Sequence, residues 1–91
     1  MIRSFGDKET RRLHDREFSR RFQSVEKTAR IRLALLDAAT ALSDLSLPGL
    51  RLEALAGDRS GQYSIRINDR FRICFRWCGG DALDVEIVDY H

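Results

Sequence analysis

The spacing of apolar residues changes once along this chain, near Pro48-Gly49, and that change constrains the fold more than any other feature. Before it, apolar residues recur every three or four positions, as on one face of a helix. After it, apolar and polar residues alternate, as in strands with one buried face. The sequence therefore predicts an α+β fold, in which a helical first half covers a sheet formed by the second half.

A short strand and a first helix are expected at the start. Ile2–Phe5 has the pattern of a strand, and Asp7 is a suitable N-cap for a helix over residues 8–15. Phe18 and Phe22 follow four residues apart, and we expect both rings to pin this segment to the core.

A second, longer helix is expected over residues 25–42, with Ser24 as its N-cap and Pro48-Gly49 ending the segment. Its apolar residues form one stripe at helical spacing, which predicts the face that packs on the core. The predicted stripe is Ile31, Leu35, Ala38, Ala39 and Leu42.

Four strands are expected after Pro48-Gly49, near residues 50–53, 63–67, 71–77 and 83–88. Asn68-Asp69 and Gly79-Gly80-Asp81 favour tight turns, which join antiparallel neighbours. The expected order is β-α-α-β-β-β-β in one domain, residues 1–91. Two N-terminal helices then pack on a small, mostly antiparallel sheet.

Strand parity assigns a group of polar residues to the face of the sheet opposite the helices, because side chains alternate between faces. They are Arg51, Glu53, Ser64, Arg66, Arg72, Arg76 and Tyr90. Polar alternation is normal on a solvent-facing antiparallel sheet. Arginines crowded on one small face repel one another unless an anion satisfies them, so we favour an anion-binding face.

Positive charge is unevenly distributed, although the formal net charge is only +2. Residues 1–30 hold nine Lys or Arg against five Asp or Glu, and residues 51–76 hold six arginines. Arginine binds phosphate through a planar, bidentate contact, so this distribution suits RNA or an acidic partner. A solvated surface in which arginine simply replaces lysine is the alternative.

Several classes of protein are disfavoured. The first residues lack the apolar region of a signal peptide, and no run is long enough to span a membrane, so we expect a cytoplasmic protein with no membrane partner. Cys74 and Cys78 lie roughly 13 Å apart on an extended strand, too far for a disulfide. Without a nearby histidine they do not form a zinc site, and we expect no metal and no cofactor.

A series of short motifs follows in order along the second half of the chain. They are Arg51-Leu52-Glu53-Ala54-Leu55, Gly57-Asp58-Arg59-Ser60-Gly61, Tyr63-Ser64-Ile65-Arg66-Ile67-Asn68, Arg72-Ile73-Cys74-Phe75 and Val88-Asp89-Tyr90-His91. With the start Met1-Ile2-Arg3-Ser4-Phe5, this series resembles the HigB toxins of the RelE/ParE superfamily, over essentially the whole chain. The resemblance implies a RelE-like fold and ribosome-dependent mRNA cleavage that inhibits translation. It also implies a HigA-type helix-turn-helix antitoxin, and contact with operator DNA only through the toxin–antitoxin complex.

The resemblance also implies the site residues. The related toxin YoeB has a glutamate, an arginine and a histidine that match Glu53, Arg72 and His91, assigned there as general base, phosphate stabiliser and general acid. Tyr90 is expected in the same catalytic set. Residues expected to bind RNA are Arg51, Arg59, Arg66, Arg76 and Asp89. Other HigB toxins carry a histidine in place of Glu53 and a lysine in place of Ala56, so this chain resembles a HigB framework with a YoeB-like base.

These groups suit RNA cleavage without a metal ion. A base takes the proton of the ribose 2′-hydroxyl, a cation stabilises the pentavalent phosphate, and an acid protonates the leaving 5′-oxygen. Only RNA offers this internal nucleophile. The 70S ribosome is expected to hold the mRNA in reactive geometry. The N-terminal arginines expected to dock ribosomal RNA are Arg11, Arg12, Arg16, Arg20 and Arg21.

Two other functions stay open. A ParE-like toxin would share the fold and poison DNA gyrase through protein contact, but it needs no Glu–Arg–His set, so Tyr90-His91 disfavours it. A catalytically degenerate partner, which only binds its antitoxin or RNA, is allowed by the departures at Glu53 and Ala56.

Overall fold

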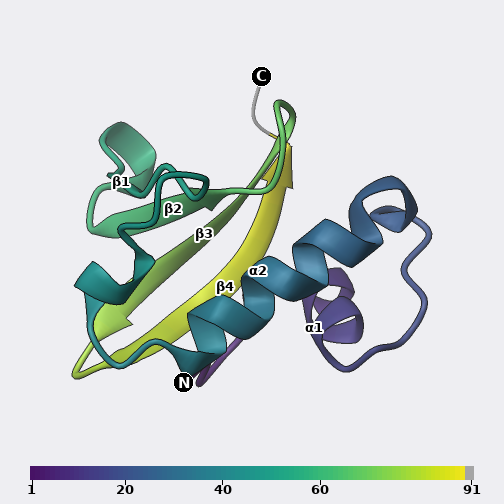
Figure 1. Ribbon diagram of the computed structural model, residues 1–91, viewed down its shortest axis with the longest axis horizontal. Helices are drawn as coiled ribbons and strands as arrows, with labels where there is room; N and C mark the ends of the chain where they lie inside the picture. The colour runs from purple at the N-terminus through teal and green to yellow at the C-terminus, as the bar shows by residue number, and fades with distance from the viewer. Residues whose placement is uncertain (90–91) are drawn as a thin grey trace.

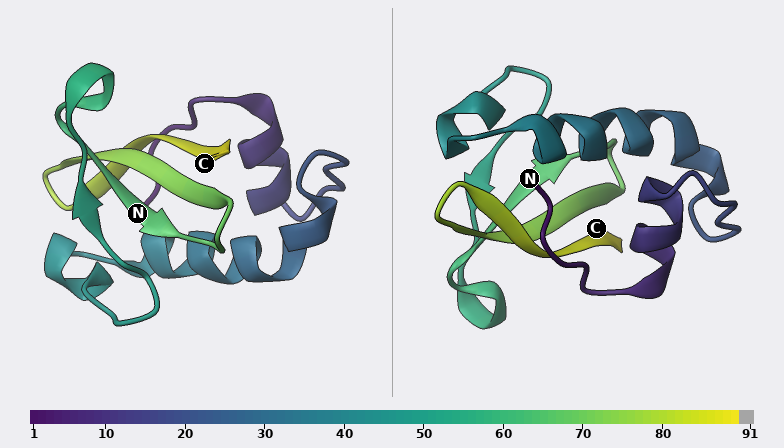
Figure 2. Two further views of the ribbon diagram at one scale, coloured as in Figure 1. Left: turned by 90° about the horizontal axis from the view of Figure 1, so that it is seen from above. Right: turned by 90° about the horizontal axis from the view of Figure 1, so that it is seen from below.

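The computed structural model describes residues 1–89 as two layers, with two helices packed against a four-stranded sheet (Figure 1). The helices are α1 (Lys8–His14) and α2 (Glu26–Ala38), and the strands are β1 (Glu53–Ala54), β2 (Gln62–Arg66), β3 (Phe71–Cys78) and β4 (Asp81–Asp89). Short 3-10 helices in the connections are η1 (Gln23–Val25), η2 (Leu42–Leu45) and η3 (Gly57–Arg59). In Figure 2, α2 lies across one face of the sheet and leaves the opposite face open.

The sheet has the order β1-β2-β3-β4, and each neighbouring pair is antiparallel. The N-terminal segment runs parallel to β4 and joins it through single bridges, Ile2 to Ala82 and Phe5 to Val85. The expected first strand is therefore a short parallel addition beside β4. The predicted fold class, element order and mostly antiparallel sheet are confirmed.

Both predicted tight turns form, and each has a clear local cause. The Asn68 side-chain oxygen accepts hydrogen bonds from the backbone N–H groups of Arg70 at 2.9 Å and Phe71 at 2.7 Å, which closes the turn between β2 and β3. Gly79 and Gly80 take left-handed φ values of 57° and 85° between β3 and β4, which glycine adopts without steric cost.

The helix starts agree with the prediction at α1 and differ at α2. Asp7 caps α1 by accepting a hydrogen bond from the Thr10 N–H at 3.3 Å. Ser24, predicted to cap the second helix, lies inside η1, and α2 begins at Glu26 without a side-chain cap. The expected role of Ser24 is therefore wrong. Burial of Val25 in η1, next to Ser24, sets the direction of the chain here, and this packing outweighs the capping preference.

Only one of the two phenylalanines in the segment before α2 reaches the core. The Phe22 ring is fully buried and packs edge-on against Phe71, with ring centroids 5.7 Å apart. Phe18 is 60% exposed, so its predicted place in the core is wrong. The wrong prediction followed from equal spacing, which does not say which of two rings faces inward.

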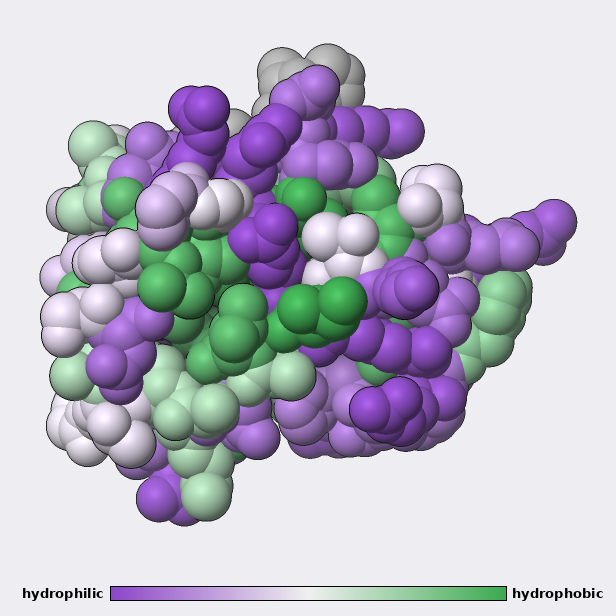
Figure 3. Space-filling model, viewed as in Figure 1, coloured by the Kyte–Doolittle hydropathy of each residue, from purple (hydrophilic) through white to green (hydrophobic). Residues whose placement is uncertain are grey.

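The face that α2 turns to the sheet also differs from the predicted stripe. The helix buries Ala29, Leu33 and Leu36, whereas Ile31 and Leu35 stay 53% and 38% exposed. Figure 3 views the molecule from the α2 side, and apolar surface lies in the middle of that face. Both sets have helical spacing, because apolar residues surround much of the helix. Helical spacing in the sequence therefore could not decide which of the two sets faces the core.

The end of α2 explains the remaining members of that stripe. The helix stops at Ala38, which is exposed, rather than near Leu42. Ala39 is buried and Leu42 packs against the core, but both do so from the irregular segment that follows the helix. The core itself is completed by the apolar sides of β2, β3 and β4, with Ile65, Ile73, Phe75, Val85 and Ile87 among its buried residues.

Candidate active site

The register of the sheet brings polar side chains from all four strands into one row on the open face. Glu53 on β1 pairs with Ser64 on β2, Ser64 pairs with Cys74 on β3, and Cys74 pairs with Glu86 on β4. Residues paired in this way point to the same face of an antiparallel sheet. Strand parity predicted this common face for Glu53 and Ser64, and the register confirms it.

Arg72 pairs with Arg66 in the next register position, and its side chain reaches this row, where three contacts to other residues of the 1–89 range hold it. Its Nε donates a hydrogen bond to Ser64 Oγ at 2.8 Å, and one terminal nitrogen donates to the Arg51 carbonyl at 2.7 Å. The same terminal nitrogen lies 3.5 Å from Glu53 Oε1. The Arg72 side chain is only 12% exposed, against 52% for Glu53. The protein thus fixes the guanidinium and leaves the carboxylate open to solvent.

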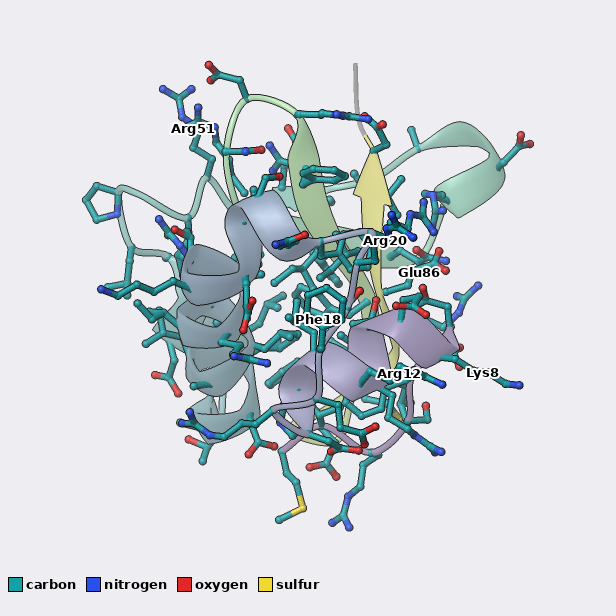
Figure 4. All side chains as sticks on the ribbon, turned by 90° about the vertical axis from the view of Figure 1, so that its right-hand side faces the viewer. Lys8, Arg12, Phe18, Arg20, Arg51 and Glu86 are labelled. Atoms are coloured by element: carbon teal, nitrogen blue, oxygen red, sulfur yellow. The ribbon has the colours of Figure 1, made fainter. Side chains whose placement is uncertain are left out.

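Arg51 joins the site through its backbone. Its φ of 47° is left-handed, which is costly for a residue with a side chain, and its carbonyl accepts the hydrogen bond from Arg72. In Figure 4 Arg51 lies on the α2 side of the sheet and Glu86 on the open side. The expected place of the Arg51 side chain on the open face is therefore wrong. The left-handed residue interrupts the alternation just before β1 begins at Glu53.

Arg59 reaches the open face from η3, the turn between β1 and β2. One of its terminal nitrogens lies 2.8 Å from Glu86 Oε1 and donates to Gln62 Oε1 at 3.0 Å. Because Gln62 is on β2 and Glu86 on β4, this side chain extends over the strand between them. Arg59 and Arg72 thus approach the central row from different elements.

The other arginines of the second half also lie beside carboxylates of the same chain. Arg66 pairs with Asp69, Arg70 Nη2 lies 2.8 Å from Asp89 Oδ2, and Arg76 Nε lies 3.6 Å from Asp84 Oδ2. The pairing with Asp89 raises the pKa of Arg70 further above its ordinary value. Internal acids therefore relieve the repulsion that, in the sequence, argued for an external anion.

Cys74 forms the floor of the site. It lies on the open face, yet its side chain is fully buried. Burial raises the pKa of the Cys74 thiol, while the nearby charge of Arg59, and after it that of Arg72, acts in the opposite direction. Cys78 is exposed, and both cysteines are free thiols, as predicted.

The N-terminal arginines have a different environment. Within residues 1–89, none of Arg11, Arg12, Arg16, Arg20 and Arg21 lies within 4.0 Å of a carboxylate oxygen. Arg21 stacks over the Phe22 ring at 5.1 Å. Figure 4 shows the exposed Phe18 close to α1, with Arg12 below it and Arg20 above it. The charge least neutralised within the described chain therefore lies on α1 and the segment after it.

The structure adds residues that the sequence did not assign to the site. Cys74, Gln62 and Glu86 contact or surround the two central arginines, and Ser64, which parity had placed on this face without a role of its own, accepts a hydrogen bond from Arg72. Parity alone places Glu86 on the open face, because it lies between the buried Val85 and Ile87. The predicted site residues Tyr90 and His91 lie outside the described residues.

Comparison with solved structures identifies the fold. The chain is similar to a chain of the YoeB–YefM complex from Staphylococcus aureus, with a TM-score of 0.61 over 100% of this chain and 98% of that one. The sequence identity is 17%, so this likeness concerns the fold alone. The helices on one face of an antiparallel sheet are thus those of the RelE-like toxin fold.

Sequence comparison gives the family. Residues 3–91 match the family described as RelE-like toxin of type II toxin–antitoxin system HigB, and the chain belongs to this HigB-like toxin family. It is 45% identical over 62 residues to Toxin HigB-1 of Vibrio cholerae, a match covering 67% of this chain. It is 38% identical over 60 residues to Endoribonuclease HigB of Proteus vulgaris, covering 66%. Each match spans 65% of the relative's own length.

Proposed function

We propose that this protein is the toxin of a type II toxin–antitoxin pair and cuts mRNA on the ribosome without a metal cofactor. The observation that carries the proposal is the pair formed by Arg72 and Glu53. A cation is fixed by three contacts on a face that α2 leaves open, and a carboxylate stands 3.5 Å away and half exposed to solvent. The name Endoribonuclease HigB, given to a relative 38% identical over 60 residues, agrees with this chemistry.

The proposed reaction uses these groups in order. The Glu53 carboxylate takes the proton of a ribose 2′-hydroxyl, and the freed oxygen attacks the adjacent phosphorus. Arg72 stabilises the charge on the pentavalent phosphate. The bond to the 5′-oxygen breaks, and His91 donates a proton to that oxygen, with Tyr90 assigned to the same catalytic set. The products are a 2′,3′-cyclic phosphate and a free 5′-hydroxyl.

Docking is assigned to a different surface. Within residues 1–89 the arginines of α1 and the following segment have no carboxylate beside them, as is also true of Arg32 and Arg51, but here they lie close together in the chain and Phe18 offers an exposed ring between them. Such a surface suits the phosphates and bases of ribosomal RNA. A ribosome that holds the mRNA in reactive geometry supplies up to about 7–11 kcal/mol of the barrier.

We further propose that a HigA-type antitoxin neutralises the protein and that operator DNA is contacted only through that complex. A cytoplasmic location follows from this proposal, since ribosomes and mRNA are there. Across residues 1–89, neither helix has the length and apolar character that crossing a membrane requires.

The test is cleavage of a defined mRNA by the purified protein, with and without 70S ribosomes, read out by mapping the new 5′ ends. Cuts are expected only with ribosomes, and Arg72→Ala should remove them. Arg3→Ala is the matched control, because Arg3 pairs with Asp81 at the start of β4, outside the central row. Cutting of free RNA would overturn ribosome dependence. Growth arrest with intact mRNA and damaged DNA would favour the gyrase-poisoning alternative.

A further inference from the structure

The η3 turn is connected to the open face of the sheet through Arg59. Its neighbouring residues Ala56, Gly57, Asp58, Ser60 and Gly61 are all exposed. Arg59, by contrast, has a side chain only 33% exposed and lies 2.8 Å from Glu86 Oε1, which is 28% exposed. The contact joins a turn near one edge of the sheet to β4 at the other edge. Figure 4 shows Glu86 on the open side of the sheet, beside this turn.

Cys74 is paired with Glu86 in the sheet, so it lies next to this contact. A residue in the middle of an open sheet face is normally accessible, yet Cys74 is 0% exposed. In the register it lies between Ser64, which is bonded to Arg72, and Glu86, which is paired with Arg59. The charges acting on its thiol are those of Arg59, Glu86, Arg72 and Glu53. The thiol is therefore buried at a point of the sheet that has one ion pair on each side, Arg72–Glu53 and Arg59–Glu86.

We propose that the Arg59–Glu86 ion pair is a clasp that holds η3 across the sheet, and that Glu86 is a positioning residue for RNA binding. Through Arg59 it sets a second guanidinium opposite Arg72, with Cys74 as the floor between them. The clasp is a property of the fold, whereas its role in binding a phosphate of the RNA rests on the proposed function.

The geometry gives Glu86 this role in preference to that of a base. Its carboxylate is engaged by a guanidinium at 2.8 Å, whereas Glu53 stands 3.5 Å from Arg72 and is nearly twice as exposed. A carboxylate held at hydrogen-bond distance fixes its partner in place. Gln62 contributes a second acceptor to Arg59, so loss of Glu86 loosens the arginine without releasing it entirely.

The clasp is tested by the accessibility of Cys74, which needs no assumption about activity. In a Cys78→Ser background, Cys74 is the one thiol left in the chain, and its alkylation by iodoacetamide is followed by mass spectrometry. We expect Arg59→Ala and Glu86→Ala to speed labelling about tenfold or more, the effect of losing one charge-assisted hydrogen bond. Glu86→Gln, which keeps an acceptor, should have a smaller effect. Asp81→Asn, another β4 carboxylate paired with an arginine, is the control and should change nothing.

The sign of the Arg59→Ala result is diagnostic. Removing a positive charge near the thiol raises its pKa and by itself slows alkylation, so faster labelling must come from exposure. Losing the Glu86 carboxylate has the opposite charge effect, because it lowers the thiol pKa and by itself speeds alkylation. Once rates are corrected for the thiolate fraction of each variant, the double variant Arg59→Ala, Glu86→Ala should therefore be labelled no faster than Arg59→Ala alone. Unchanged labelling in the single variants, or additive effects in the double variant, overturns the clasp. If Glu86→Ala fails to fold, Glu86→Gln and Arg59→Ala still decide the question.

The binding role is tested separately on ribosome-bound mRNA. Glu86→Ala should raise KM about three- to tenfold and leave kcat unchanged, as expected when binding common to ground and transition states is lost. Faster Cys74 labelling with an unaltered KM would keep the clasp and remove its role in RNA binding. A wild-type protein that cuts no mRNA would overturn the proposed function and leave the labelling result standing.

Discussion

Arg72 Nε and Ser64 Oγ lie 2.8 Å apart on neighbouring strands, and Ser64 is completely buried. A buried hydroxyl on a strand has little freedom to move, so it fixes the plane of the guanidinium that it contacts. The arginine proposed to stabilise the phosphate is thus oriented by a hydrogen bond to a small, buried residue of β2. Orientation of this kind decides whether an arginine can make bidentate phosphate contacts.

Replacing Ser64 by alanine should therefore weaken cleavage without unfolding the protein. Arg72 keeps the Arg51 carbonyl and Glu53 but loses the acceptor for Nε, and kcat on ribosome-bound mRNA should fall about tenfold. Ser60→Ala, at an exposed serine of the connection after η3, is the control and should keep the wild-type rate. Equal rates for both variants would show that Ser64 does not orient Arg72.

The site was predictable from the sequence where it depends on strand parity. Glu53, Ser64, Arg66 and Arg72 share a face because alternation holds through β1, β2 and most of β3. Parity failed at Arg51, where a left-handed residue interrupts the alternation. It also could not predict the ion pairs that neutralise the arginines, because these depend on side-chain reach across strands and from η3.

The unneutralised arginines of α1 and the following segment should control docking. Removing Arg11, Arg12 and Arg20 together should lower the slope of log K against log salt concentration for ribosome binding by about one unit per arginine. Arg3→Ala removes a surface arginine that already pairs with Asp81, and it should leave the slope nearly unchanged. Binding is measured by co-sedimentation with ribosomes over a salt series. A slope that stays at the wild-type value in the triple variant would place the docking surface elsewhere.

The two apolar faces of α2 should differ sharply in their contribution to stability. Leu33 is fully buried, so Leu33→Ala should lower the free energy of unfolding by about 2–5 kcal/mol. Ile31 is 53% exposed, and Ile31→Ala should change the free energy of unfolding by no more than about 0.5 kcal/mol. Urea unfolding followed by circular dichroism measures both. A large loss for Ile31→Ala would mean that the helix is rotated from the position described.

Which face of α2 packs on the sheet could not be predicted from the spacing of apolar residues. Two interleaved sets of apolar residues, one with Ile31 and Leu35 and the other with Ala29, Leu33 and Leu36, satisfy the same periodicity. The choice between them is made by packing against β4 and by the buried Phe22 and Val25 that lead into the helix. None of these contacts can be inferred from the sequence of the helix alone.

Asp44 should make stability depend on acid pH. Its side chain accepts hydrogen bonds from the backbone N–H groups of Thr40 at 3.0 Å and Ala41 at 3.1 Å, which hold its pKa below the ordinary value of 3.8. A pKa lowered by folding means that the stabilisation is complete above the unfolded value and is lost as the pH falls towards the folded value. Asp44→Asn should thus be less stable than the wild type at pH ~7, and the difference should shrink below pH ~4. Unfolding curves whose difference stays constant from pH ~7 to pH ~3 would contradict this.

The proposed general base provides the sharpest test of the chemistry. Glu53→Gln keeps the size and the hydrogen bonding of the side chain but cannot accept the proton of the 2′-hydroxyl. Single-turnover cleavage of ribosome-bound mRNA should fall by about 10²–10⁴-fold, the usual contribution of a positioned base. Ribosome binding should change little, because Glu53 is half exposed and its ion pair with Arg72 is long, at 3.5 Å.

Glu53→His completes this test. From the resemblance to other HigB toxins, histidine is the residue expected at this position. An imidazole can also take the proton, so much of the activity should be retained. Imidazoles titrate near pH ~6.5 and carboxylates near pH ~4.3, so the acid limb of the pH–rate profile should move upward in this variant. If Glu53→Gln cuts at the wild-type rate, Glu53 is a surface partner of Arg72, and cleavage then relies on electrostatic stabilisation by the arginines without a side-chain base.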